Sequence, residues 1–143
     1  MCEGNSKDNT AMIPRDATLR VVRPTDNLSQ LTEMYSKALG FEMLKQFKDQ
    51  DGFDGVVLGH SRHAYHIEFV QQHGVTTGRA PTQDNLLVFY LDCSRVWERA
   101  CRGMIDAGFT VVESNNPYWE RVGKTFEDVE GYRVVLQNRD WDN

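Results

Sequence analysis

The residues best suited to chemistry in this chain lie in the segment 65–70. His66 and Glu68 are two positions apart, so in a β-strand their side chains point to the same face. Imidazole nitrogens and carboxylate oxygens bind zinc, nickel and other divalent ions. His63 lies upstream at a predicted turn, and the sequence identifies no third ligand. Two interpretations remain open, a local metal site or incidental binding of an adventitious ion, and we prefer the second.

Glu68 also needs a partner of opposite charge. The residues that alternate with it, Tyr65, Ile67 and Phe69, are apolar and predict a face packed on a helix, so Glu68 points to the opposite side. A buried, unpaired carboxylate costs several kcal/mol. Arg20, on the first predicted strand, is the nearest candidate partner. The pair is either a polar anchor for a ligand or a salt bridge without a binding role.

Two further candidates lie in the second half of the chain. Arg133 alternates with Val135 and Gln137 on the last predicted strand, which predicts that these side chains line a cleft. There Arg133 would offer a cation to an anionic ligand, unless it lies on the rim. Trp119, in the loop 116–119, can stack on a flat ligand, or it serves loop packing or a dimer contact.

The fifth predicted strand adds an apolar surface. Asn85, Leu87 and Phe89 share one of its faces. We expect this face to form a partly apolar floor of the cleft.

The elements that position these residues occur as two copies of one pattern. Gly40-Phe41 and Gly108-Phe109 each end a helical stretch and open an apolar strand. Asp26 or Asn27 can cap the first helix and Asp92 the second, and Asp51-Gly52 predicts a hairpin turn. The predicted strands are 19–23, 41–47, 53–58, 65–70, 86–91, 109–112, 124–127 and 132–137.

This order predicts an α+β fold of two βαβββ modules, whose curved sheets enclose a shared cleft. We expect one domain over residues 17–140. Its predicted parts are a disordered tail at 1–16, a first module at 17–70, a linker at 71–84 and a second module at 85–143.

Composition excludes several functional classes. The chain has 143 residues, 40% of them hydrophobic, which suits a soluble domain with a real core. A formal charge of −5 argues against a nucleic-acid or anionic-membrane surface. No apolar run approaches the roughly 20 residues that span a bilayer, and no signal peptide is visible. We therefore expect a cytoplasmic protein.

The repeated Gly-Phe step, together with Asp128-Val129-Glu130-Gly131 before the last strand, resembles the vicinal oxygen chelate superfamily. This superfamily contains glyoxalase I, bleomycin-resistance proteins and extradiol dioxygenases, and the resemblance covers residues 18–139. The segments 20–26, 65–69 and 116–119 further resemble a bacterial branch of it.

The resemblance implies where metal ligands would stand. Metal enzymes of the superfamily carry a His or Gln on the first strand and a Glu or His on the last strand of each module. Glu68 matches one of these positions, while Arg20, Asn85 and Val135 stand at the other three. Arginine and valine cannot bind a cation and asparagine is a weak ligand. We therefore expect no metal site and no cofactor, and we assign no catalytic residue.

The combined expectation is a protein that binds a small organic molecule in its cleft without a catalytic metal. The alternative is a metal-dependent lyase, isomerase or dioxygenase of the same superfamily, using His66 and Glu68 with a divalent metal. A third hypothesis is a domain that mainly dimerises, through Trp119 and Trp141. A homodimer fits all three. The predicted ligand-binding residues are Arg20, His66, Glu68, Asn85, Phe89, Trp119 and Arg133.

Overall fold

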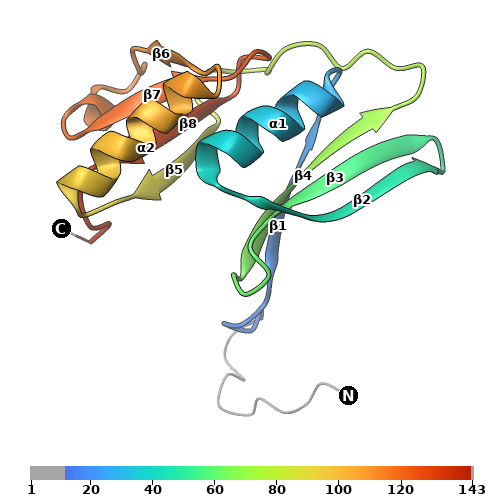
Figure 1. The fold of residues 1–143 in the computed structure, drawn as a ribbon, viewed down its shortest axis with the longest axis horizontal. Coiled ribbons are helices and arrows are strands. Elements are labelled where there is room, and N and C mark those ends of the chain that lie inside the picture. Colours follow the sequence, from blue (N-terminus) through green and yellow to red (C-terminus); the bar gives the residue numbers. More distant parts are fainter. Residues whose placement is uncertain (1–11, 143) are drawn as a thin grey trace.

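The computed structural model describes residues 12–142 and folds them as two modules side by side (Figure 1). Of the predicted tail, residues 1–11 lie outside the described part, and 12–16 contain no helix or strand. The first module comprises β1 (Leu19–Pro24), α1 (Leu28–Leu39), β2 (Glu42–Gln50), β3 (Phe53–Gly59) and β4 (Tyr65–Gln72). The second comprises β5 (Leu86–Tyr90), α2 (Ser94–Asp106), β6 (Thr110–Val112), the 3₁₀ helix η2 (Pro117–Glu120), β7 (Gly123–Glu127) and β8 (Arg133–Gln137).

The two sheets share one topology. Sheet A has the strand order β1-β4-β3-β2 and sheet B the order β5-β8-β7-β6. The first and last strands of each module run parallel, and the other pairs are antiparallel. The α+β fold of two βαβββ modules is therefore confirmed.

The helix starts differ in detail from the sequence-based expectation. Asn27 takes the N-cap position of α1, but its side chain makes no capping hydrogen bond. At α2 the N-cap is Cys93, so the prediction of Asp92 is wrong by one residue. The physical reason at Asn27 is tertiary, because its amide donates instead to Glu130 of the second module at 2.9 Å.

One hydrophobic core joins the modules. The two helices pack against each other and against the inner faces of both sheets (Figure 1). Tyr35 of α1 and Met104 of α2 are fully buried, and the Tyr35 ring lies 5.1 Å from that of Phe109. On β4, Ile67 and Phe69 belong to this core, which confirms the predicted apolar face of that strand. Glu68 therefore points away from the helices.

A buried polar network also crosses between the modules. The Tyr35 hydroxyl donates to the Asp128 carboxylate at 2.7 Å, and Arg23 donates to the same hydroxyl at 3.4 Å. The guanidinium of Arg23 also lies over the ring of Tyr132, 4.3 Å from its centre. Burial raises the pKa of Asp128, although the hydrogen bonds that its carboxylate accepts lower it in part.

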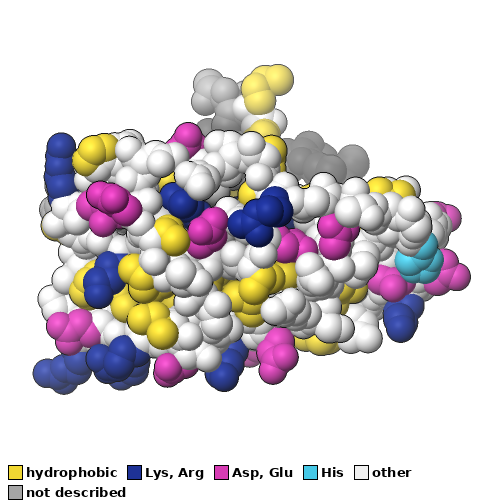
Figure 2. Space-filling view, turned by 90° about the horizontal axis from the view of Figure 1, so that it is seen from above, with side chains coloured by type: hydrophobic (Ala, Val, Ile, Leu, Met, Phe, Trp, Pro, Cys, Tyr) yellow, Lys and Arg dark blue, Asp and Glu magenta, His cyan; other side chains and the backbone are white. Residues whose placement is uncertain are grey.

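On the outside, acidic and basic side chains alternate with small apolar areas over the face seen in Figure 2. Within residues 12–142, no helix has the length and apolar character needed to cross a membrane.

Candidate functional site

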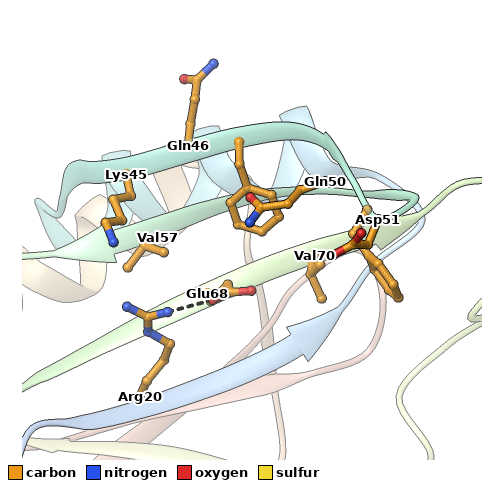
Figure 3. A pocket seen from close by; sticks show the side chains of 10 residues that line it. Arg20, Lys45, Gln46, Gln50, Asp51, Val57, Glu68 and Val70 are labelled. Atoms are coloured by element: carbon orange, nitrogen blue, oxygen red, sulfur yellow. Dashed lines mark hydrogen bonds and ion pairs between the residues drawn. The ribbon is translucent and has the colours of Figure 1, made fainter.

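The site is built on the face of sheet A that is turned away from the helices. The parallel register places Arg20 of β1 beside His66 of β4. Arg20 donates from Nη1 to Glu68 Oε1 at 3.0 Å and from Nε to His66 Nδ1 at 3.2 Å (Figure 3). The predicted Arg20–Glu68 pair is therefore confirmed as an ion pair, and His66 joins it.

The hydrogen bond to His66 defines the state of its ring. Because Nδ1 accepts from Arg20, the neutral imidazole carries its proton on Nε2. Glu68 is more sheltered than its partner, since its side chain is 13% exposed against 39% for Arg20. The pair alone contributes about 1 kcal/mol or less to stability, as expected for a partly solvated ion pair.

The β2–β3 hairpin brings a second group of side chains over this face. A register shift between Met43 and Lys45 leaves Lys45 opposite Val57. In Figure 3 the Lys45 amine points toward the space above Arg20 and Glu68, whereas Gln46 points away from it.

Phe47 forms a wall of the site because its partner in the register is a glycine. Phe47 pairs with Gly55, and a Cβ atom at Gly55 would lie 2.2 Å from the Phe47 ring. The ring thus occupies space that any other residue at position 55 would fill. Glycine here is required for close approach.

Together these side chains enclose a hollow of about 660 Å³ on sheet A. Its walls combine two cations, two carboxylates, the Gln50 amide and apolar surface (Figure 3). The lining residues are Arg20, Lys45, Gln46, Phe47, Gln50, Asp51, Phe53, Val57, Glu68 and Val70.

A second hollow of about 390 Å³ adjoins the first, since both are lined by Arg20, Lys45 and Val57. It contains His66 together with His60 and His63. The rings of His60 and His63 lie edge to face with their centres 4.7 Å apart. The two hollows form one groove, with the three histidine rings at one end and the turn between β2 and β3 at the other.

The arrangement can hold an anionic or carbonyl-bearing group. A guanidinium has five N–H donors, and Arg20 uses one on Glu68 and one on His66. The remaining donors and the Lys45 ammonium can bind an oxyanion, while Phe47 and Phe53 can contact a flat apolar body.

Comparison with known proteins places the chain in a family. The family model described as YycE-like N-terminal domain matches residues 19–70, and that of the YycE-like C-terminal domain matches residues 84–138. The uncharacterized protein YycE of Bacillus subtilis (strain 168) is 36% identical over 122 residues, which cover 85% of this chain and 88% of that protein. The chain belongs to the YycE-like family. A crystal structure of YycE from Bacillus subtilis, a protein of unknown function, matches the YycE-like chain with a TM-score of 0.80 and 35% identity, covering 87% of this chain and 91% of that one.

More distant structures share the fold. Glyoxalase I of Leishmania major matches with a TM-score of 0.66 and 16% identity, covering 85% of this chain and 86% of that one. TnmS3, an antibiotic binding protein from Streptomyces sp. CB03234, matches with a TM-score of 0.60 and 16% identity, over 88% of this chain and 96% of that one. The YycE-like chain therefore has the vicinal oxygen chelate fold.

The side chains at the metal positions of this fold do not fit an ion in the YycE-like chain. By strand register, the residues that match Arg20 and Glu68 in the second module are Leu86 and Val135. The prediction of Asn85 at the first of these positions is therefore wrong by one residue. Of these four, Glu68 alone carries a ligating group, and its carboxylate is held by Arg20. Within residues 12–142, no three His, Cys, Asp or Glu side chains gather around a point that could hold a metal.

The three residues predicted to form the floor of the cleft lie elsewhere. Phe89 and Leu87 pack against the helix core and line an apolar groove with Tyr65, so their shared face is not the floor of the sheet A groove. This corrects the predicted face of the fifth strand. The reason is the strand register. Leu86 and Val88 pair with Arg133 and Val135, and paired residues share a face, so Leu86 and Val88 take the outer face and Leu87 and Phe89 the inner one. Asn85 precedes β5 and is also outside the groove.

Arg133 and Trp119 also lie apart from the Arg20–Glu68 pair. Arg133 is on the predicted outer face of sheet B, but it is only 5% exposed, so it lies neither on a rim nor in an open cleft. The loop that carries Trp119 covers this face, and the Trp119 carbonyl accepts a hydrogen bond from Gln137 at 3.1 Å. The predicted face of β8 is therefore right for Arg133, but the loop that covers this face was not predicted.

Sequence reasoning missed the hairpin residues of the site. Lys45 and Phe47 alternate on β2, yet bulges between Met43 and Lys45 and between Phe47 and Gln50 shift the side-chain pattern of that strand. The available signal was Gly55, an isolated glycine inside an apolar strand, which marks a close approach.

Proposed function

We propose that this YycE-like protein binds a small organic anion in the groove on sheet A and does so without a catalytic metal. The observation that carries this proposal is the Arg20–Glu68 ion pair of 3.0 Å on the floor of a hollow of about 660 Å³. Arg20 and Lys45 would hold the anionic group, Glu68 would orient Arg20, and Phe47 and Phe53 would contact the ligand body. The antibiotic binding protein TnmS3 gives a precedent for small-molecule binding on this fold.

The experiment is a thermal-shift screen of organic acids, followed by calorimetry on the hits. A bound acid is expected to raise Tm in the wild type and to lose at least about tenfold in affinity in Arg20→Met and Lys45→Met, since each removes a charged hydrogen-bond donor worth roughly 1.5–3 kcal/mol. Arg102→Met, at an exposed cation on α2 of the other module, is the matched control and should bind normally. Hits that bind all variants equally would refute the proposal.

Elemental analysis separates this proposal from the metal-dependent alternative. Protein purified without a histidine tag should contain no stoichiometric divalent metal. A stoichiometric metal lost in both His66→Ala and Glu68→Ala would favour a lyase, isomerase or dioxygenase instead.

We also propose that the protein is a homodimer. An apolar groove of about 300 Å³ runs between β1 and β5, both of which are outer strands of their sheets. Leu19 at its edge is 61% exposed, which favours burial against a second copy. Leu19→Asp should shift the molecular mass in light scattering from dimer to monomer, and a wild type that is already monomeric would refute the dimer.

A further inference from the structure

The faces of the two sheets that are turned away from the helices differ in their exposure to solvent. On sheet A the outer face forms the open groove. On sheet B the corresponding face is covered by the segment 113–122, which contains η2. Two side chains of β8 reach this cover, since Arg133 Nη1 donates to the Glu113 carbonyl at 3.3 Å and Gln137 Nε2 to the Trp119 carbonyl at 3.1 Å.

The covered face is polar. Arg133 and Gln137 share one side of β8, and the β7–β8 register puts Thr125 on the same side, opposite Val135. The exposed fractions are 0% for Thr125, 1% for Gln137 and 5% for Arg133. The cover therefore removes a hydroxyl, an amide and a guanidinium from water.

One polar atom of each of these residues has no partner among residues 12–142. These atoms are Thr125 Oγ1, Arg133 Nε and Gln137 Oε1. Burying a neutral polar group without a hydrogen bond costs about 1–3 kcal/mol of folding free energy. Burying an unpaired charged group costs more. A permanently covered face would be more stable with apolar side chains at these three positions.

The segment is internally bonded, so it can move as a unit. Its Ser114 amide donates to the Glu120 carboxylate at 2.8 Å, and the Asn116 side chain accepts from the Tyr118 amide at 3.0 Å. These bonds do not involve the sheet. Lifting the segment breaks the side-chain bonds from Arg133 and Gln137, and also those from Asn115 to Gln83 and Asp84. The backbone bond from the Asn138 amide to the Val122 carbonyl ties the far end of the segment to the sheet, and the internal turn stays intact.

We propose that the segment 113–122 is a cover that opens, and that the face beneath it binds an organic acid with a hydrogen-bond donor at its far end. Arg133 takes the carboxylate and Gln137 Oε1 accepts from the donor. Four residues of strand separate their Cα atoms by about 13 Å, a gap that the two long side chains narrow. Thr125 and Val135 lie between them, and Val135 favours an apolar middle part of the ligand. This site is separate from the groove on sheet A.

The opening is tested on the wild-type protein by NMR. The Arg133 Nε–H and the Gln137 amide protons are buried and should exchange with solvent faster than the backbone amide of Val135 in the same strand, because they need only the cover to lift. Exchange of all three at the same slow rate would mean that the face opens only when the module unfolds, and it would overturn the proposal.

The ligand class is tested with 4-hydroxybenzoate, which has a carboxylate and a hydroxyl at opposite ends of a ring. The Trp119 indole resonance, identified with Trp119→Phe, should shift saturably in the wild type and in Arg20→Met but not in Arg133→Met. Benzoate, which lacks the hydroxyl, should bind about three- to tenfold more weakly than 4-hydroxybenzoate, and Gln137→Leu should abolish this difference.

Two outcomes of the titration would overturn the assignment. One is the lack of a saturable shift up to about 10 mM, well above the range of weak specific binding. The other is a shift that survives Arg133→Met and disappears in Arg20→Met, which would locate the acid on sheet A. Gln137→Leu, a buried substitution to an apolar residue of similar size, keeps the test informative if Arg133→Met does not fold.

Discussion

Glu130 links the two modules through a single carboxylate oxygen, and its removal gives the sharpest test of how they are held together. Glu130 is only 5% exposed. Its Oε2 accepts from the Thr25 hydroxyl at 2.8 Å, from the Asp26 amide at 3.0 Å and from the Asn27 side-chain amide at 2.9 Å. The bonds reach the chain just before α1, where the helix has no side-chain cap of its own.

The expected loss of stability in Glu130→Ala follows from this geometry. Hydrogen bonds to a charged group contribute about 1.5–3 kcal/mol each, but here three share one oxygen. Thr25 is buried and would lose its hydrogen bond outright. Asn27 is exposed, so water can replace Glu130 as the acceptor of its side-chain hydrogen bond. We therefore expect Glu130→Ala to lower the free energy of unfolding by about 3 kcal/mol, and Tm by roughly 10 °C.

The assay is urea unfolding followed by circular dichroism, with Glu98→Ala on the exposed side of α2 as the control. The control should change stability by no more than about 0.5 kcal/mol. A double-mutant cycle with Thr25→Val should give a coupling of about 1–2 kcal/mol between positions 25 and 130. A loss below about 1 kcal/mol, or strict additivity in the cycle, would refute the idea that this carboxylate holds the modules together.

Three further predictions follow from the same structure. Gly55→Ala should displace the Phe47 ring from the groove, weakening ligand binding and costing about 1–3 kcal/mol, and unchanged affinity would contradict that role. Because burial raises the pKa of Asp128, the stability linked to its protonation is present at acid pH and is lost as pH rises through the folded-state value. Asp128→Asn should thus gain stability relative to the wild type as the pH rises above the ordinary carboxyl pKa of 3.8, and parallel stability profiles would argue against it. Burial also raises the pKa of Cys101, so alkylation mapped by peptide mass should reach exposed Cys93 long before Cys101, and equal rates at the two thiols would be inconsistent with the fold.

Local sequence was sufficient for the elements and for one half of the site. Gly40 ends α1 with a φ of 69°, a conformation that glycine adopts at little cost. The strict alternation on β4 assigned Ile67 to the core and Glu68 to the other face, because side chains of a strand point to opposite sides in turn. Both signals act within a few residues, so no partner strand was needed to interpret them.

The rest of the groove depended on strand pairing. Lys45 and Phe47 take their places only through the irregular register of β2 against β3. A shift of one residue exchanges the two faces of a strand, and bulges cannot be located from alternation alone. Phe89 was expected on the outer face of sheet B but lies on the inner one, because β5 is apolar throughout and no alternation marks its two faces.

The sequence by itself determined the doubled βαβββ pattern, the glycines at which the helices stop and the direction of the Glu68 side chain, because propensity and periodicity are properties of neighbouring residues. Tertiary structure alone decided that Glu130 would complete the start of α1 and that the segment 113–122 would lie over Arg133. Those contacts join residues far apart in the chain, and their free energy exists only once both modules have packed around one core.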